Sequence, residues 1–273
     1  MEKRGEERRI GKRELFISVD GLDGIGKGEI ERALISFEQK LGRSVLDCIS
    51  FSRAHSKGLP EIGDFWQPPN IHYNTIVTSD PSYAGIGVAI RDEIIARNER
   101  NYNAVVNIQA YAIDRLITMK KTVIPALKNG VRVIQSRCVA ASLTYQFLKA
   151  IEENIPKEKA REIILKQTGN KLQLEWAPDL LIIPTIKDMK KLIERLENRK
   201  KFEKDDKSVF DNLTFQEKLK PLYESKSLKQ LFESHGTEVK YLDAGVSPEH
   251  TRKQALEIYI EFLRKKGCFN QNH

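Results

Sequence analysis

Short apolar runs alternate with amphipathic stretches along most of this chain. Residues 15–19 form the first run, which is rich in strand-favouring side chains and stops at a glycine-rich turn. After the turn, apolar residues recur at three- and four-residue steps, as on one face of a helix: Ile30, Ala33, Leu34, Phe37 and Leu41. The pattern predicts a buried parallel strand, a turn and an amphipathic helix.

The same alternation continues to the end of the chain. Further apolar runs predict strands at residues 44–51, 131–135, 179–184 and 238–242, and residues 75–79 form a shorter β-like run. Helical periodicity predicts a helix from residue 85 onward and others at 104–127, 140–151, 156–167, 189–199, 215–223, 228–234 and 248–265. Strands that alternate with helices predict an α/β fold with a parallel sheet of about five strands between helices.

The periodic pattern covers one domain, predicted at residues 14–266. Residues 1–13 carry six basic and three acidic side chains without a period, and we expect a disordered basic leader there. Residues 52–74 contain three prolines and no steady period, which predicts an inserted, lid-like loop. Residues 267–273 are expected to be a tail.

The turn after the first strand carries the clearest chemistry. Residues 21–28 read G-L-D-G-I-G-K-G, which has the glycine spacing and the lysine of a phosphate-binding P-loop. Glycines let backbone N–H groups surround a phosphate, the helix N-terminus adds its dipole, and Lys27 adds a full charge. The predicted nucleotide-binding residues are therefore Gly21, Asp23, Gly24, Ile25, Gly26, Lys27, Gly28 and Glu29. An ordinary strand-to-helix turn is the simpler interpretation, but the lysine at this position of the motif favours phosphate binding. A dinucleotide-binding motif fits less well, because its G-x-G-x-x-G pattern is not completed.

One letter departs from the P-loop pattern. Gly28 stands where a Ser or Thr hydroxyl normally ligates Mg²⁺. The ion would then be held through waters, through nucleotide oxygens or by a carboxylate such as Asp20, Asp23 or Glu29. The sequence leaves these three alternatives open, so the metal ligands are unassigned.

Composition narrows the class of protein. With 273 residues, 40% of them apolar and 31% charged, the chain can bury a substantial core. No apolar run approaches the length of a membrane helix, about 20 residues, and we expect a cytoplasmic protein without a membrane partner. The formal charge of +8 is spread out and comes with no nucleic-acid motif, so nucleic acid is not the expected partner. Three scattered cysteines predict neither a disulfide framework nor a zinc site.

Four motifs in order resemble those of thymidylate kinases. The P-loop resembles that family's G-x-D-G-x-G-K, and Asp80-Pro81 followed by Gly85-Ile86-Gly87 and Ile90-Arg91 resembles its E-P-G-G-T-x-I-G…I-R. Residues 111–115 (Y-A-I-D-R) resemble its F-A-A-D-R, and residues 136–146 resemble its D-R-Y-x…S-x-A-Y-Q. The resemblance implies a three-layer P-loop NTPase fold and transfer of phosphate from ATP, with Mg²⁺, to dTMP for dTDP biosynthesis.

The resemblance also implies roles for single residues. Lys27 would hold the transferring phosphates, and Arg137 would hold the acceptor phosphate. Arg195 and Arg199 would close a lid at residues 195–212 over ATP. The predicted catalytic residues are therefore Lys27, Arg137 and Arg199. Asp23 would bind the acceptor's 3′-hydroxyl, and Arg115 would reach its pyrimidine edge. The remaining predicted acceptor-site residues are Asp80, Arg91, Tyr111, Tyr145 and Gln146. The resemblance implies a homodimer through the 104–127 helix, although its apolar stripe is equally consistent with burial inside one chain.

Two departures from the family pattern keep a second hypothesis open. Ser136 and Cys138 replace the Asp and Tyr of D-R-Y, so a carboxylate is missing at the same time as the P-loop hydroxyl. Either another carboxylate takes over, or the protein is a catalytically degenerate nucleotide-binding pseudokinase or scaffold. A nucleic-acid-associated kinase is a third alternative, for which steeply salt-dependent oligonucleotide binding would be the sign.

Overall fold

A computed structural model describes residues 13–56, 58–67, 71–96, 98–202 and 213–268. Several predicted segments lie partly outside these ranges. They are the leader (1–13, of which only Arg13 is described), the end of the lid (203–212), the end of the tail (269–273) and four residues of the insertion (57 and 68–70).

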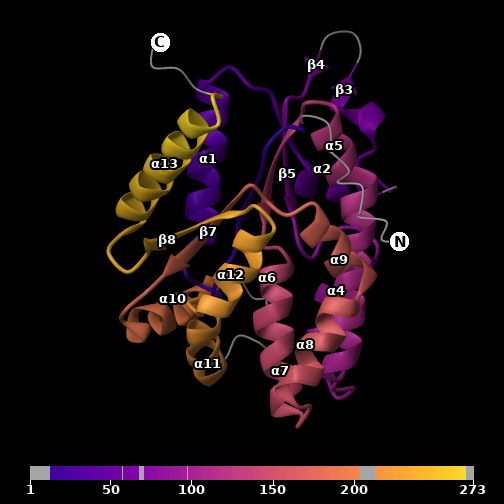
Figure 1. The fold of residues 1–273 in the computed structure, drawn as a ribbon, viewed down its shortest axis with the longest axis vertical. Coiled ribbons are helices and arrows are strands. Elements are labelled where there is room, and N and C mark those ends of the chain that lie inside the picture. Colours follow the sequence, from indigo (N-terminus) through magenta and orange to yellow (C-terminus); the bar gives the residue numbers. More distant parts are fainter. Residues whose placement is uncertain (1–12, 57, 68–70, 97, 203–212, 269–273) are drawn as a thin grey trace, which may run out of the picture.

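Six parallel strands form one sheet in the order β2-β5-β6-β1-β7-β8 (Figure 1). The strands are β1 (Phe16–Val19), β2 (Val45–Asp47), β5 (Thr75–Ser79), β6 (Arg132–Ser136), β7 (Leu180–Thr185) and β8 (Glu238–Asp243). The predicted α/β fold is confirmed, with six strands in the sheet where about five were expected. The extra strand is β5, expected only as a β-like run, which is fully buried because it pairs with both β2 and β6.

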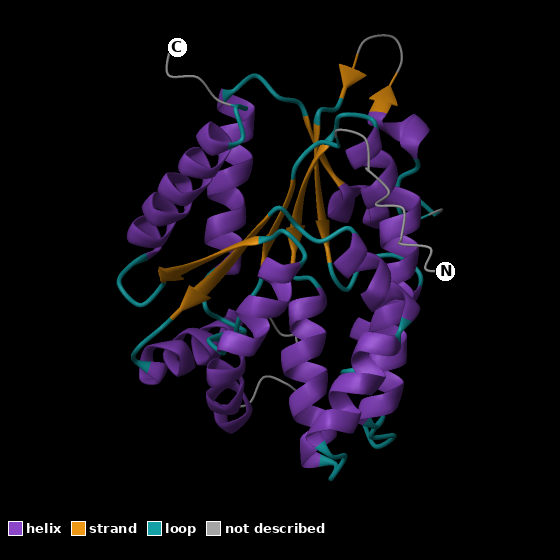
Figure 2. Cartoon of the chain, viewed as in Figure 1, coloured by secondary structure: helices purple, strands orange, loops and turns teal. Residues whose placement is uncertain are grey.

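Helices cover both faces of the sheet (Figure 2). They are α1 (Lys27–Lys40), α2 (Cys48–Ala54), α3 (Ile86–Ala89), α4 (Ala104–Thr118), α5 (Ile124–Lys128), α6 (Val139–Ala141), α7 (Phe147–Glu152), α8 (Lys157–Lys166), α9 (Thr168–Glu175), α10 (Met189–Phe202), α11 (Leu213–Tyr223), α12 (Lys226–Ser234) and α13 (Pro248–Lys265). Helices α1 and α13 pack side by side on one face, and α4 packs against α9 on the other (Figure 1). Three π-helical turns, Ile90–Ile94, Met119–Val123 and Ser142–Gln146, extend α3 and join α4 to α5 and α6 to α7. No helix in the described part of the chain is long and apolar enough to cross a membrane.

The predicted strand at 44–51 is wrong in its second half. Strand β2 ends at Asp47, and α2 begins at Cys48. The carboxylate of Asp47 accepts hydrogen bonds from the backbone N–H groups of Ile49 (2.9 Å) and Ser50 (3.4 Å), which caps the helix. The insertion is also more regular than expected, because after α2 it contains the 3-10 turn Ile62–Phe65 and the antiparallel pair β3 (Trp66–Gln67) and β4 (Ile71–His72).

Helix α9 was not predicted, because Gly169 follows the predicted helix at 156–167 and glycine is common just past the end of a helix. Gly169 instead lies inside α9, where this helix crosses α4. A Cβ atom at this position would lie 1.9 Å from the carbonyl oxygen of Ala112. The glycine therefore allows close helix packing and does not stop the chain.

A buried ionic cluster fixes the far end of α1. Glu38 is fully buried, and its carboxylate accepts hydrogen bonds from Arg132 of β6, Tyr259 of α13 and Thr75 of β5, each at 2.8 Å. Arg43 adds an ion pair at 2.9 Å. The cluster ties α1 to two strands and to α13, and so it sets the direction in which the N-terminus of α1 points.

Candidate functional site

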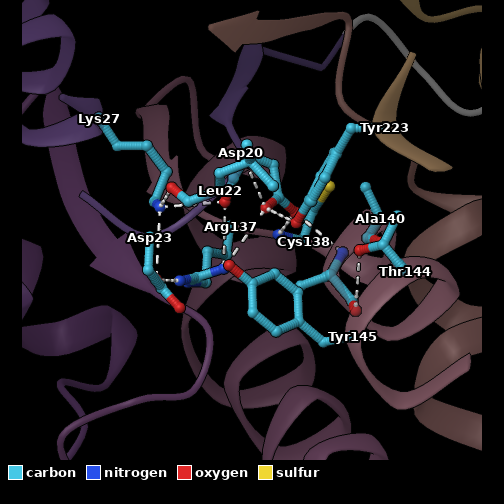
Figure 3. Close-up of polar contacts among 12 residues, drawn as sticks. Asp20, Leu22, Asp23, Lys27, Arg137, Cys138, Ala140, Thr144, Tyr145 and Tyr223 are labelled. Carbon is cyan, nitrogen blue, oxygen red and sulfur yellow. Dashed lines mark hydrogen bonds and ion pairs between the residues drawn. The ribbon is translucent and has the colours of Figure 1, made fainter. Parts of the chain in front are cut away.

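The P-loop forms at the carboxyl end of β1 and leads into α1. Gly24 and Gly26 have φ values of 71° and 102°, a left-handed backbone that favours glycine. The Lys27 ammonium donates hydrogen bonds to the carbonyl oxygens of Gly21 (3.0 Å) and Leu22 (2.7 Å) (Figure 3). Burial and the nearby Arg137 charge lower the pKa of Lys27 to about 8. The lysine is thus curled onto its own loop, close to where a phosphate would enter.

Asp20 holds the loop in place and has no capacity left for a ligand. Its carboxylate is fully buried and accepts hydrogen bonds from the backbone N–H groups of Gly21 (2.8 Å), Cys138 (3.0 Å) and Ala141 (3.0 Å). The Tyr223 hydroxyl of α11 donates a fourth at 2.8 Å (Figure 3). Asp20 therefore joins β1 to the end of β6 and is a structural anchor.

Arg137 follows β6 and faces the P-loop. Its guanidinium forms an ion pair with Asp23, lies 3.8 Å from Asp20 and sits 5.0 Å from the ring centroid of Tyr145 (Figure 3). Lys27 lies 3.7 Å from the same Asp23 carboxylate. The structure thus gathers the predicted residues Asp23, Lys27, Arg137 and Tyr145 at the carboxyl edge of the sheet, where open α/β sheets bind ligands.

A cleft of about 670 Å³ runs from the P-loop to the ends of β5 and β6. Most of the predicted nucleotide- and acceptor-site residues line it: Asp23, Gly24, Ile25, Gly26, Lys27, Gly28, Glu29, Asp80, Arg91, Tyr111, Arg137, Tyr145, Gln146 and Arg195. Sequence reasoning missed other lining residues, notably Ile49, Tyr83, Pro248 and Thr251. Local patterns gave no signal for these, because α2, the turn after β5 and the start of α13 meet only in the folded chain.

Arg91 is held from two sides at the end of the cleft that lies beyond β5. It donates hydrogen bonds to the carbonyl oxygens of Pro81 (2.6 Å) and Ser82 (3.2 Å), and its guanidinium carbon lies 3.9 Å from the ring centroid of Tyr83. Arg53 of α2 also lies over Tyr83, at 4.6 Å. The insertion therefore helps to position the side chains at this end.

Arg115 lies beneath the cleft and does not line it. Its side chain is 1% exposed and pairs with Asp80 at 2.6 Å. It also donates hydrogen bonds to Ser142 (3.1 Å) and to Asn170 of α9. These contacts are those of a buried ion pair. The expectation that Arg115 reaches the pyrimidine edge of an acceptor stays a prediction. Its Nη2 atom is buried without a hydrogen-bond partner.

Two predicted residues belong to α10. Arg195 lines the cleft, and the side chains of Leu192 and Leu196 pack over Gly24. Arg199 lies in the same helix, but its side chain is outside the described structure, as are residues 203–212 of the predicted lid.

The carboxylates proposed for Mg²⁺ from the sequence are already engaged. Asp23 pairs with Arg137, and Glu29 pairs with Arg32 and Arg252. Among the described residues, no group of three or more His, Cys, Asp or Glu side chains could hold a metal ion by itself. A carboxylate that sequence reasoning missed, Glu31, also lines the cleft, and its four-residue spacing from Lys27 was the available signal.

Comparison with known proteins connects this site to a family. A family model described as thymidylate kinase matches residues 69–255, more than half of the chain, and its match begins after the P-loop. A thymidylate kinase of Cereibacter sphaeroides is 23% identical over 258 residues, which are 93% of this chain and 98% of that protein. A probable thymidylate kinase of Archaeoglobus fulgidus is 20% identical over 94% of this chain and 100% of its own length. A probable thymidylate kinase of Caldivirga maquilingensis is 25% identical over 68% of this chain and 69% of its own length. With the family model matching over most of the cleft and with relatives that span the P-loop as well, the chain belongs to the thymidylate kinase family.

Proposed function

We propose that this protein transfers the terminal phosphoryl group of ATP to dTMP and releases ADP and dTDP. The observation that carries the proposal is the pair of cations, Lys27 and Arg137, that meet at Asp23 in one cleft. Phosphoryl transfer depends mainly on positioning and charge stabilisation, which two such cations supply. The bond from phosphorus to the ADP oxygen breaks, and a bond to an oxygen of the acceptor phosphate forms.

Each end of the cleft suits one substrate. The P-loop N–H groups and Lys27 would bind the phosphates of ATP, with Arg195 and Thr251 at the same end. Arg137 would bind the acceptor phosphate, because a planar guanidinium matches two phosphate oxygens. In the structure these cations rest on loop carbonyls and on Asp23, and substrate phosphates would replace those contacts.

The acceptor pocket would be built from Asp80, Tyr111, Tyr145 and Gln146, which line the other end. The Oε1 atom of Gln146 is buried without a hydrogen-bond partner, as expected of a group that waits for a polar ligand. The choice of dTMP rests on the names of the relatives. Arg115 would support this pocket through Asp80 rather than by reading the base directly.

Mg²⁺ bound with the nucleotide would neutralise phosphate charge during transfer. The residues present fit such an ion, because Glu31 leaves one buried carboxylate oxygen, Oε1, without a hydrogen-bond partner in the cleft.

A homodimer is part of the proposal, with α4 as its interface. Ile113 and Ile117 of α4 are 49% and 42% exposed, and one helical turn separates them on one face. Ile113→Glu should convert a dimer to a monomer in analytical ultracentrifugation. An unchanged sedimentation coefficient in the variant would contradict an α4 interface.

We place the reaction in the cytoplasm, where it would serve dTDP biosynthesis.

The test is ADP release from ATP and Mg²⁺ with a panel of nucleoside monophosphates, with Lys27→Ala as the control. We expect turnover with dTMP above all other acceptors and its loss in the control. The second candidate function is nucleotide binding without catalysis. Gly28 and Ser136 favour it, because they replace the hydroxyl and the carboxylate of the family pattern. ATP binding by calorimetry without turnover of any acceptor would establish it and refute the kinase.

A further inference from the structure

Glu31 is a carboxylate in the cleft to which no motif assigns a role. It lies one helical turn after Lys27 on α1, so both side chains project from the same side of the helix. Its Oε1 atom is buried and has no hydrogen-bond partner among the described residues. Buried polar groups are normally paired, so an open carboxylate oxygen inside a binding cleft points to a missing ligand.

The positive charges near Glu31 favour the ionised form of its carboxylate, which is the form that binds a metal ion. Ser136, at the end of β6, also lines the cleft, and its side chain acts to lower the pKa of Glu31. Burial raises the pKa of Glu31, while Ser136 and the charges of Lys27 and Arg137 act in the opposite direction. A carboxylate that lines a phosphate-binding cleft and keeps one buried oxygen free has the form of a hard-cation ligand.

The other carboxylates in or near the cleft are less suited to this role. Asp20 already accepts four hydrogen bonds, and Glu29 is held by two arginines. Asp23 is shared between Arg137 and Lys27. Asp80 also has an open oxygen, but it lies at the end of β5 and is fixed by its ion pair with Arg115.

We propose that Glu31 is the carboxylate that holds the Mg²⁺ of the bound nucleotide, in place of the hydroxyl missing at Gly28 and the carboxylate missing at Ser136. This inference rests on the proposed function, because it takes the cleft to bind an ATP–Mg²⁺ complex. Mg²⁺ in phosphate sites commonly binds one or two carboxylates together with phosphate oxygens and waters, so one glutamate is enough.

The test measures how much Mg²⁺ strengthens nucleotide binding, without any turnover. The affinity for a non-hydrolysable ATP analogue is measured by calorimetry with Mg²⁺ and with EDTA. In the natural protein Mg²⁺ should raise the affinity for the analogue, and this increase in affinity is the gain from Mg²⁺. In Glu31→Gln that gain should fall by about tenfold or more, since even indirect metal partners contribute that much. Glu257→Gln removes an equal charge from an exposed site on α13 and should keep the gain.

Two additions sharpen the test. Adding Ser136→Asp to Glu31→Gln places a carboxylate at the neighbouring strand end and should restore the gain from Mg²⁺. The electron paramagnetic resonance spectrum of Mn²⁺ with the analogue should change on adding the natural protein and change less with Glu31→Gln.

Failure of this inference differs from failure of the proposed function. An equal gain from Mg²⁺ in Glu31→Gln and in the natural protein would overturn the role of Glu31, even if dTMP is phosphorylated. Binding of the analogue that does not depend on Mg²⁺ in the natural protein would overturn it as well. If the protein shows no turnover but the gain from Mg²⁺ depends on Glu31, the kinase function is refuted and the metal site is supported.

Discussion

Nucleotide binding to this protein should take up a proton at mildly alkaline pH. Burial and the charge of Arg137 lower the pKa of Lys27 to about 8, so its side chain loses its charge as the pH rises through 8. A phosphate that binds against Lys27 favours the charged ammonium and raises its pKa again. The bound complex therefore carries a proton that part of the free protein lacks.

The size of the effect follows from that pKa. With a pKa of about 8 in the free protein, uptake should be about 0.1 proton at pH 7, about 0.5 at pH 8 and about 0.9 at pH 9. The same linkage weakens nucleotide binding by about tenfold between pH 7 and pH 9, because the neutral lysine must first be protonated. Phosphate itself ionises near pH 6 and contributes little at pH 8 or above.

Calorimetry measures this uptake directly. ADP is titrated at pH 8 in two buffers of different ionisation enthalpy, and the difference in apparent binding enthalpy gives the number of protons taken up. Lys27→Met keeps much of the side-chain volume without the amine and should abolish the buffer dependence. Equal binding enthalpies in both buffers for the natural protein would refute the assignment of a lowered pKa to Lys27.

Three further predictions concern buried or paired arginines. Arg137→Lys keeps the charge but loses the planar guanidinium that can contact two phosphate oxygens. We expect kcat/KM to fall by about a hundredfold in a steady-state assay, as for the loss of one preorganised hydrogen-bond donor. An unchanged kcat/KM would exclude Arg137 from binding the acceptor phosphate. Arg115→Gln leaves Asp80 unpaired in a buried site and should lower the free energy of unfolding in urea by about 3–5 kcal/mol; a change confined to acceptor KM would instead support direct base reading. Glu38→Gln breaks the buried ion pair with Arg132 and should lower the free energy of unfolding by about 3 kcal/mol, measured in urea. The preference among acceptors, measured by steady-state kinetics, should not change.

Features that depend on neighbouring residues could be predicted from the sequence. The P-loop needs a strand, a turn of fixed glycine spacing and a helix, and all of these lie within residues 14–41. The ends of parallel strands collect at one edge of a sheet, so the meeting of Asp23, Asp80 and Arg137 in one cleft also followed from the pattern.

Features that depend on distant partners could not be predicted in the same way. Arg115 faces the core because Asn170 and Ser142 accept its hydrogen bonds, and Asn170 belongs to α9, the helix that the sequence pattern did not reveal. Gly169 has the same appearance in a sequence whether it stops a helix or lets two helices touch. Strand β5 was underestimated because its Thr and Ser residues are polar, although pairing on both sides buries all of them.

The kinase assignment is tested most directly by following the phosphate. ATP labelled in its γ-phosphate is incubated with the protein, Mg²⁺ and dTMP, and the nucleotides are separated. The account predicts labelled dTDP from the natural protein and none from Lys27→Ala. Labelled product from another nucleoside monophosphate in preference to dTMP would contradict the acceptor. No labelled nucleoside diphosphate from any acceptor, under conditions where ATP binds, would contradict the kinase function itself.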